Sequence, residues 1–369
     1  MIRIAVDAMG GDHAPREIVH GSILAAQEYG IAIQLVGPPD VVNAELKRHD
    51  TTGLKITVVP ASEVVAMDEK PSRAILKKKD SSIVVTTKLV SDGLADGMVA
   101  CGSTGAAAVA AQIGLGRINH VDRSAIGAFM PTTGDFNCVL VDGGANVDCN
   151  ALQLEQFGMM GSILYKGVFG VQNPRVGLLN IGTEESKGNE LVQEAYKLLK
   201  ANRYKLNFIG FCEGRDFPMG KVDVVVTDGF SGNLCLKTAE GIANMVLHML
   251  RQELLRSTRV KIGSMICKPA FQGVKKRIDH NEFGGALLLG VKGVCVIAHG
   301  GSKHTAVKNA IRVAKDMAAA KIVDKIEAAL AAAAKEKEGT TKDNNGASSE
   351  SSSPSSSSDV ATPKTGRTK

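Results

Sequence analysis

GMVACGSTGA, residues 97–106, is a short apolar run that ends in a glycine-rich polar turn. The same pattern occurs in IRIAVDAMGGD (2–12), CVLVDGGAN (138–146), VGLLNIGTEE (176–185), DVVVTDGFSGN (223–233) and VCVIAHGGS (294–302). Such runs are typical of buried parallel strands, and open α/β sheets bind ligands at the carboxyl ends of these strands. The sequence therefore predicts a doubly wound α/β sheet whose functional residues lie in these turns, at one edge of the sheet.

The segments between these runs alternate between helical and strand patterns. Apolar periodicity predicts helices over residues 15–29, 41–48 and 81–93, and strands over residues 31–37 and 55–60. The alternation continues to about residue 334, as expected of an open sheet with helices on both faces. We therefore predict a single catalytic α/β domain over residues 1–334.

Two segments depart from this alternation. Residues 241–285 contain no convincing strand and carry two amphipathic helical patterns, the second of which is bent or broken by Pro269. They are predicted to form a helical arm. Residues 335–369 are rich in serine, and Val360 is their one aliphatic residue larger than alanine, so they are predicted to be a disordered tail.

Composition narrows the class of protein. The 369 residues are 44% hydrophobic and carry a net charge of +6, which fits a folded protein with a large core. Tryptophan is absent and aromatic residues make up 4%, which argues against a base-stacking surface and a nucleic-acid partner. The seven cysteines form no C-x-x-C pair, and the chain opens on a strand without a signal-peptide pattern. A cytoplasmic protein with reduced thiols is expected, without a membrane-spanning segment.

Glycine-rich turns that lead into helices suit the binding of an anion. Glycine lets the backbone approach a ligand closely, and the N–H groups at a helix start favour phosphate or carboxylate. The alternative is that these glycines only close tight turns, and that Asp12 only caps a helix. The candidate contacts to phosphate or an oxyanion are Asp7, Gly10, Gly11, Gly102, Ser103, Thr104, Gly105, Asp142, Asn146, Asn180, Asn189, Asp228, Gly229, Gly232 and Lys237.

Three further residues are candidates for catalysis: His299, Lys187 and Asn233. A histidine at a strand end can serve as acid, base or hydrogen-bond donor, although it can equally be a core imidazole, and Lys187 can equally be a solvated charge. No Walker A loop, dinucleotide fingerprint or G-x-S-x-G elbow occurs, and the histidines form no cluster with metal-ligand spacing. We therefore expect neither a cofactor nor a metal, and a reaction in which the bound anion itself attacks.

Together, these motifs resemble the PlsX-type phosphate acyltransferases, over residues 1 to about 320. The resemblance is carried, in order, by DAMGGDHAP (7–15), PSRAILKKKDSSI (71–83), GSTGA (102–106), DGGAN (142–146), LLNIGTEESKGNE (178–190), VVVTDGFSGN with LKTAEG (224–233, 236–241) and GGALLLGVKGVCVIAHG (284–300). This chain departs from the family in having Ser103 where asparagine is usual and Leu287 where proline is usual, and in lacking a second serine near Gly301.

The resemblance implies a fold like those of isocitrate dehydrogenase and phosphotransacetylase, and a homodimer. It also implies transfer of a fatty acyl group from acyl carrier protein to inorganic phosphate, giving an acyl phosphate for a glycerol-3-phosphate acyltransferase in phospholipid synthesis. A short-chain phosphotransacetylase acting on acyl-coenzyme A, a dehydrogenase of the same fold and a non-catalytic membrane-associated scaffold remain alternatives.

The same resemblance suggests that the arm contacts the carrier protein or a membrane. Acyl carrier protein is acidic, so a basic amphipathic segment is suited to contact the carrier or a membrane surface peripherally. A dimer-packing helix with a solvated basic face is the alternative. The candidate contacts are Lys261, Lys268, Lys275, Lys276 and Arg277.

Overall fold

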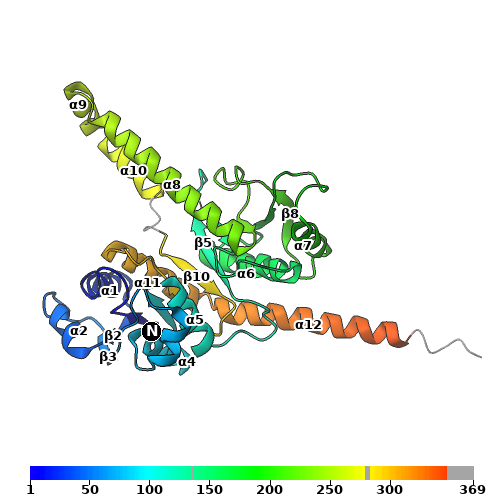
Figure 1. Ribbon diagram of the computed structural model, residues 1–369, viewed down its shortest axis with the longest axis horizontal. Helices are drawn as coiled ribbons and strands as arrows, with labels where there is room; N and C mark the ends of the chain where they lie inside the picture. Colours follow the sequence, from blue (N-terminus) through cyan, green and yellow to red (C-terminus); the bar gives the residue numbers. More distant parts are fainter. Residues whose placement is uncertain (135, 279–282, 347–369) are drawn as a thin grey trace, which may run out of the picture.

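The computed structural model describes residues 1–134, 136–278 and 283–346. Within them the chain forms an eleven-stranded sheet with helices on both faces (Figure 1). The strand order is β3-β2-β1-β4-β11-β10-β5-β6-β9-β7-β8. This arrangement confirms the predicted open α/β sheet.

The strands are β1 (Arg3–Asp7), β2 (Ala32–Gly37), β3 (Ile56–Pro60), β4 (Gly97–Ala100), β5 (Ala125–Met130), β6 (Cys138–Val141), β7 (Arg175–Leu179), β8 (Asn207–Cys212), β9 (Val224–Val226), β10 (Ala286–Leu289) and β11 (Cys295–Ile297). The helices are α1 (Arg16–Tyr29), α2 (Pro39–Leu46), α3 (Pro71–Lys77), α4 (Ser82–Ser91), α5 (Thr104–Gly114), α6 (Ala151–Phe169), α7 (Glu190–Ala201), α8 (Gly229–Leu254), α9 (Thr258–Ile266), α10 (Lys268–Ile278), α11 (His304–Ala319) and α12 (Ile322–Gly346). The elements predicted before residue 94 are all present, with ends that differ by at most two residues.

The centre of the sheet is antiparallel, which the sequence did not reveal. Strand β10 pairs antiparallel with both β11 and β5, and β5 pairs antiparallel with β6. As a result, β6, β9 and β7 run opposite to β1, β4 and β11, and the prediction that all six turns share one edge is wrong. The reason is chain length, because residues 131–137 and 290–294 are too short to form the crossovers that parallel neighbours need.

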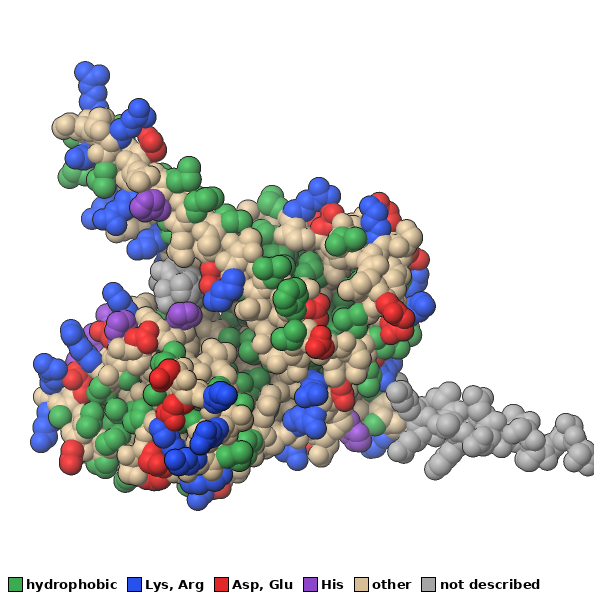
Figure 2. Space-filling model, in the orientation of Figure 1, with side chains coloured by type: hydrophobic (Ala, Val, Ile, Leu, Met, Phe, Trp, Pro, Cys, Tyr) green, Lys and Arg blue, Asp and Glu red, His purple; other side chains and the backbone are tan. Residues whose placement is uncertain are grey.

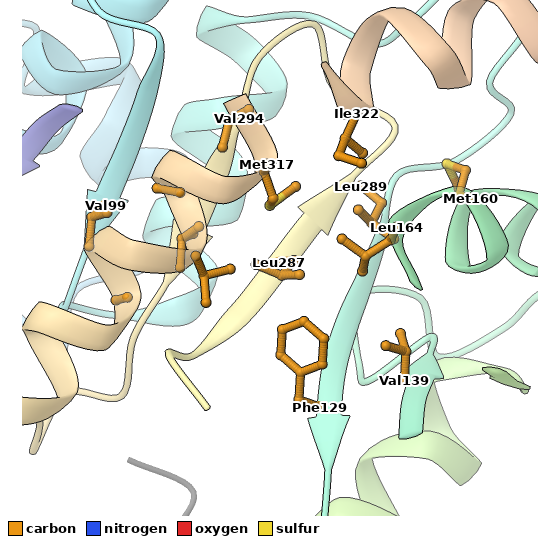
Figure 3. Packing of buried hydrophobic residues seen from close by; sticks show 14 of the residues in the cluster. Val99, Phe129, Val139, Met160, Leu164, Leu287, Leu289, Val294, Met317 and Ile322 are labelled. Carbon is orange, nitrogen blue, oxygen red and sulfur yellow. The ribbon is translucent and has the colours of Figure 1, made fainter. Parts of the chain in front are cut away.

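The two faces of the central strands differ in side-chain size. Leu287 and Leu289 of β10 point to the face covered by α6 and α11, where they pack with Leu164 and Met317 in the main core (Figure 3). Alternation along the strand turns Ala286 to the other face, which α5 and α8 cover. Small side chains on that second face leave space above the sheet, and the candidate site lies there.

The segment predicted as a helical arm, residues 241–285, contains the greater part of α8 and all of α9 and α10 (Figure 1), and its residues 279–282 lie outside the described residues. The arm begins earlier than predicted, because Asp228 caps α8 and the turn after β9 is already the first turn of that helix. Pro269 lies in the first turn of α10, just after the break that separates α10 from α9, as expected. Hydrophobic, lysine and arginine side chains lie together on the surface of the arm (Figure 2).

The start of the predicted tail differs from the structure. Helix α12 runs from Ile322 to Gly346, so the tail residues 335–346 are helical (Figure 1). Buried Ile322, Ile326 and Leu330 anchor its first turns, and the alanine-rich sequence that follows has a high helix propensity. The rest of the predicted tail, residues 347–369, lies outside the described residues.

Candidate active site

A cavity of about 200 Å³ lies on the antiparallel centre of the sheet. Its floor is formed by Ala128 of β5, Ala286 of β10 and Ile297 of β11, which are neighbours in the sheet register. Its polar lining comes from Thr104, Asn233, Lys237, Glu240, His299 and Ser302. The cavity therefore joins residues from both halves of the sheet, although their turns lie at opposite edges.

Two helices begin at this cavity, and α8 lines it with one side of its early turns. Thr104 is the first residue of α5, Asn233 lies in the second turn of α8, and Ser302 immediately precedes the cap of α11. Unpaired N–H groups and the helix dipole make such ends favourable for an anion. The helix starts therefore favour an anion in this cavity, and Lys237 lies in the lining as an ion pair with Glu240.

His299 follows the end of β11 and is exposed toward solvent at this cavity. The backbone N–H of Gly301 donates a hydrogen bond to its Nδ1, with a distance of 3.2 Å. Nδ1 is therefore an acceptor in the neutral ring, which places the proton on Nε2. In that form the imidazole can donate a hydrogen bond to an oxyanion.

The turn after β6 packs against the first turns of α8 through glycines. A Cβ on Gly232 would lie 1.9 Å from the carbonyl oxygen of Asp142, and one on Gly229 would lie 2.4 Å from that of Asn146. Gly144 has φ +128°, and its open side faces the Asn233 side chain. Glycine is thus required at these positions because α8 and the loop after β6 pack closely. This packing brings Asn233 to the cavity.

Asp142, expected to contact the substrate, instead orders its own loop. Its carboxylate is completely buried and accepts hydrogen bonds from the backbone N–H groups of Ile126, Gly144, Ala145 and Asn146 and from the Asn146 side chain. These donors occupy the acceptor positions of both carboxylate oxygens. Asp142 and Asn146 therefore shape the turn that carries Gly143 to the cavity.

The turns after β1 and β4 pack on each other below the cavity. A Cβ on Gly10 would lie 3.0 Å from the Gly102 nitrogen, and Gly11, with φ +100°, lies against Cys101 and Gly300. Asp7 is buried beneath them and accepts a hydrogen bond from the Met9 N–H; its burial raises the pKa of its carboxyl. This close packing positions the start of α5, whose cap is Ser103.

Most polar residues of the turns after β7 and β9 lie outside the cavity lining. The Lys187 Nζ is 3.2 Å from the Glu184 Oε1, and the Asn180 side chain donates to the Lys187 carbonyl oxygen. Asn189 and Asp228 accept hydrogen bonds from their own helices as N-caps. The sequence analysis named Lys187 with His299 and Asn233 as candidates for catalysis. In the structure His299 and Asn233 line the cavity and Lys187 does not.

Two lining residues were not anticipated from the sequence. Ser302 is 2% exposed and follows the AHGG sequence directly, so its position after the last strand was the available signal. Glu240 forms an ion pair with Lys237, with 2.8 Å between its Oε2 and the Lys237 Nζ. Its place one turn after Lys237 on a helix could have indicated this pair.

The cysteines offer no activated nucleophile at this site. Burial raises the pKa of the Cys295 and Cys212 thiols to about 12 and that of Cys149 to about 11. Nucleophilic cysteines have lowered pKa values, so these thiols stay protonated. Among the described residues no group of His, Cys, Asp and Glu is placed to hold a metal ion, and no described helix is long and apolar enough to cross a membrane.

The fold is similar to those of solved phosphotransacetylases. It is similar to a phosphotransacetylase from Streptococcus pyogenes (TM-score 0.59, 16% identity, covering 88% of this chain and 94% of that one). It is also similar to a phosphotransacetylase from Staphylococcus aureus (TM-score 0.53, 17% identity, covering 86% and 94%). At this identity the likeness establishes the architecture alone.

Sequence comparison establishes the family. A family model described as fatty acid synthesis protein matches residues 2–325. The chain is 48% identical to the phosphate acyltransferase of Pelotomaculum thermopropionicum, covering 89% of this chain and 95% of that one, and 50% identical to that of Heliobacterium modesticaldum, covering 85% and 93%. The chain belongs to the phosphate acyltransferase family, and it is an acyltransferase.

Proposed function

We propose that this enzyme transfers a fatty acyl group from acyl carrier protein to inorganic phosphate. The observation that carries the proposal is the cavity at the sheet centre, where the starts of α5 and α11 meet Asn233 and Lys237 of α8 and His299. Such a site holds an anion and offers donors to a developing oxyanion. The acyl phosphate formed would serve phospholipid synthesis, through a glycerol-3-phosphate acyltransferase.

The chemistry requires no nucleophile from the protein. An oxygen of hydrogen phosphate attacks the thioester carbon, a C–O bond forms, and the carbonyl becomes an oxyanion. When that oxyanion collapses, the C–S bond breaks and the phosphate proton passes to the departing sulfur, which leaves as the free thiol. Thr104, Ser302 and the helix N–H groups are suited to hold phosphate, and Asn233 and His299 to stabilise the oxyanion.

The basic side of the arm offers a place for the carrier protein. A second, polar cavity of about 490 Å³ is lined by Lys276 and Arg277 of α10 and by Lys308 and Arg312 of α11. Arg277 also donates to the Gly134 carbonyl oxygen at 2.8 Å, which fixes α10 beside the loop after β5. Positive charge next to the active site suits an acidic carrier.

The end of the arm is a second candidate contact. Ile262, Met265 and Ile266 of α9 are 60%, 74% and 78% exposed, and Lys261 and Lys268 lie beside them. Exposed apolar groups flanked by lysines favour peripheral contact with an anionic membrane surface. We propose that the enzyme works at the membrane surface as a homodimer.

A thiol-release assay tests the reaction. Palmitoyl-carrier protein should release free thiol only when phosphate is present, and the product should react with hydroxylamine. Release without phosphate would identify a thioesterase. Release from acetyl-coenzyme A but not from the carrier thioester would support a short-chain phosphotransacetylase, and no release from either would support a scaffold.

Charge reversal separates the two contacts of the arm. Lys276→Glu with Arg277→Glu should raise the KM for palmitoyl-carrier protein and leave liposome binding unchanged. Lys261→Glu with Lys268→Glu should weaken liposome binding and leave the KM for palmitoyl-carrier protein unchanged. The proposed contacts are wrong if both double variants keep wild-type carrier kinetics and liposome binding.

A further inference from the structure

An apolar cavity of about 240 Å³ lies between the arm and the sheet. Helix α8 supplies one wall through Leu236, Ala239, Ala243 and Leu247, whose spacing of three or four places them on one helix face. The end of β5 forms the facing wall with Met130 and Pro131, and Ile278 of α10 closes the side. This cavity is distinct from the polar one that α10 forms with α11.

The apolar cavity adjoins the candidate active site, and the side chains that they share lie between them. Phe129, Leu236, Glu240 and Phe283 line both. Along α8, Asn233 and Lys237 face the active site, whereas Ala243 and Leu247, farther along the same helix, line the apolar cavity alone. A substrate that reacts beside His299 therefore has an apolar path leading away from its reacting carbon.

The two charged residues where the apolar cavity meets the active site, Lys237 and Glu240, form an ion pair. Glu240 borders both cavities, and its carboxylate is 2.8 Å from the Lys237 Nζ. Beyond this pair, α8 presents mostly aliphatic side chains to the space, and Asn244 of α8 and Lys275 of α10 are the other polar residues of its lining. The two side chains of the pair are 55% and 36% exposed, so an uncharged hydrocarbon can pass beside them without burying an unpaired charge.

The path has the length of a lipid chain. Asn233 and Leu247 are separated by about 21 Å along α8 at the helical rise per residue. One leaflet of a bilayer's hydrocarbon core, and therefore one fatty acyl chain, is about 15 Å thick. A chain of that length fits between the active site and Leu247, whereas an acetyl group would leave the cavity unfilled.

We propose that this cavity seats the hydrocarbon chain of a long-chain acyl thioester and sets the chain-length preference. The inference rests on the proposed acyl transfer and specifies where the tail of its substrate lies. Each methylene buried there should strengthen binding roughly fourfold until the cavity is full. Selectivity for long chains then resides in α8 and not in the polar cavity around His299.

Filling the cavity tests the proposal. Ala243→Phe should lower kcat/KM for palmitoyl-carrier protein at least tenfold and leave that for the butyryl thioester within twofold. Ile242→Phe is the matched control, because Ile242 is the adjacent residue of the same helix, is 52% exposed and lies outside the cavity lining. Equal chain-length profiles for the two variants would overturn the proposal.

A binding measurement keeps the proposal separate from the reaction. Parinaric acid, a fluorescent fatty acid, should bind the wild type and Ile242→Phe alike and Ala243→Phe at least tenfold more weakly. Leu247→Ala only removes volume, so its preference for longer over shorter fatty acids should be stronger than that of the wild type. It replaces Ala243→Phe as the test if that variant does not fold. Binding that none of these changes alters would overturn the acyl seat, whereas binding without phosphate-dependent thiol release would overturn the proposed function alone.

Discussion

The turns after β6 and β11 have nearly the same sequence and opposite roles. One begins Asp142-Gly-Gly-Ala and the other His299-Gly-Gly-Ser, and both follow a buried strand of the sheet centre. Asp142 is completely buried and accepts the hydrogen bonds of its own loop, whereas His299 is exposed at the cavity. A polar residue at a strand end is thus a candidate substrate contact where its side chain is exposed at the cavity, and not where it is buried as the acceptor of its own loop.

The comparison predicts its largest effect at Asp142. Asp142→Ala should lower the free energy of unfolding by about 3 kcal/mol or more, because several buried N–H donors lose their acceptor. Urea denaturation measures this, with Asp148→Ala, an exposed acid of the following loop, as the control. A loss of activity with unchanged stability would instead make Asp142 a substrate contact.

His299 should behave in the opposite way. His299→Ala should reduce phosphate-dependent thiol release by about 100-fold or more, the usual loss for an acid–base or donor group. Its free energy of unfolding should change by less than about 0.5 kcal/mol, as for other exposed positions. His248→Ala on the arm is the control for activity. A destabilised but active His299→Ala enzyme would refute the contrast between the two turns.

Lys237 and Lys187 extend the comparison, because the first lines the cavity and the second does not. Lys237→Ala should raise the KM for phosphate about tenfold, the value of one charge-assisted hydrogen bond. Lys187→Ala should change it less than about twofold, because an exposed ion pair such as that with Glu184 contributes little. Initial rates against phosphate concentration decide the order, and the reverse order would restore Lys187 to the site.

The smallest effect concerns Asp7, the buried acid after β1. Burial raises the pKa of its carboxyl above the usual value of 3.8, so folding favours the protonated form. The resulting stabilisation is complete below pH 3.8 and is lost as the pH rises through the folded-state pKa. The stability of the wild type relative to Asp7→Asn should therefore decline with increasing pH. Urea unfolding across this range checks the sign, and a difference that grows with pH would contradict it.

Much of the fold could be predicted from the sequence, but the direction of its strands could not. Apolar runs such as Val224–Val226 identify buried strands locally. Whether β6 runs with or against β1 depends on the pairing of β10 and β5, short strands that lie far apart in the sequence. The turns were therefore recognised correctly and assigned to one edge incorrectly.

The site was predictable to the extent that its residues follow strand ends. Thr104, Asn233 and His299 were predicted in this way; all three line the cavity, and their roles stay predictions. Asp142 and Lys187 carry the same local signal, and only tertiary contacts show that the chain itself engages them. The cavity along α8 gave no recognisable signal, because the spacing of Ala239, Ala243 and Leu247 is common to any packed helix face.

Phosphorus NMR of the reaction mixture tests the central claim most directly. With wild-type enzyme, palmitoyl-carrier protein and inorganic phosphate, an acyl phosphate resonance should grow in proportion to the free thiol released. The resonance should be absent when Thr104 and His299 are both replaced by alanine in a protein that still unfolds cooperatively. Thiol release without acyl phosphate, or equal acyl phosphate formation by that variant, would contradict transfer to phosphate in the cavity at the sheet centre.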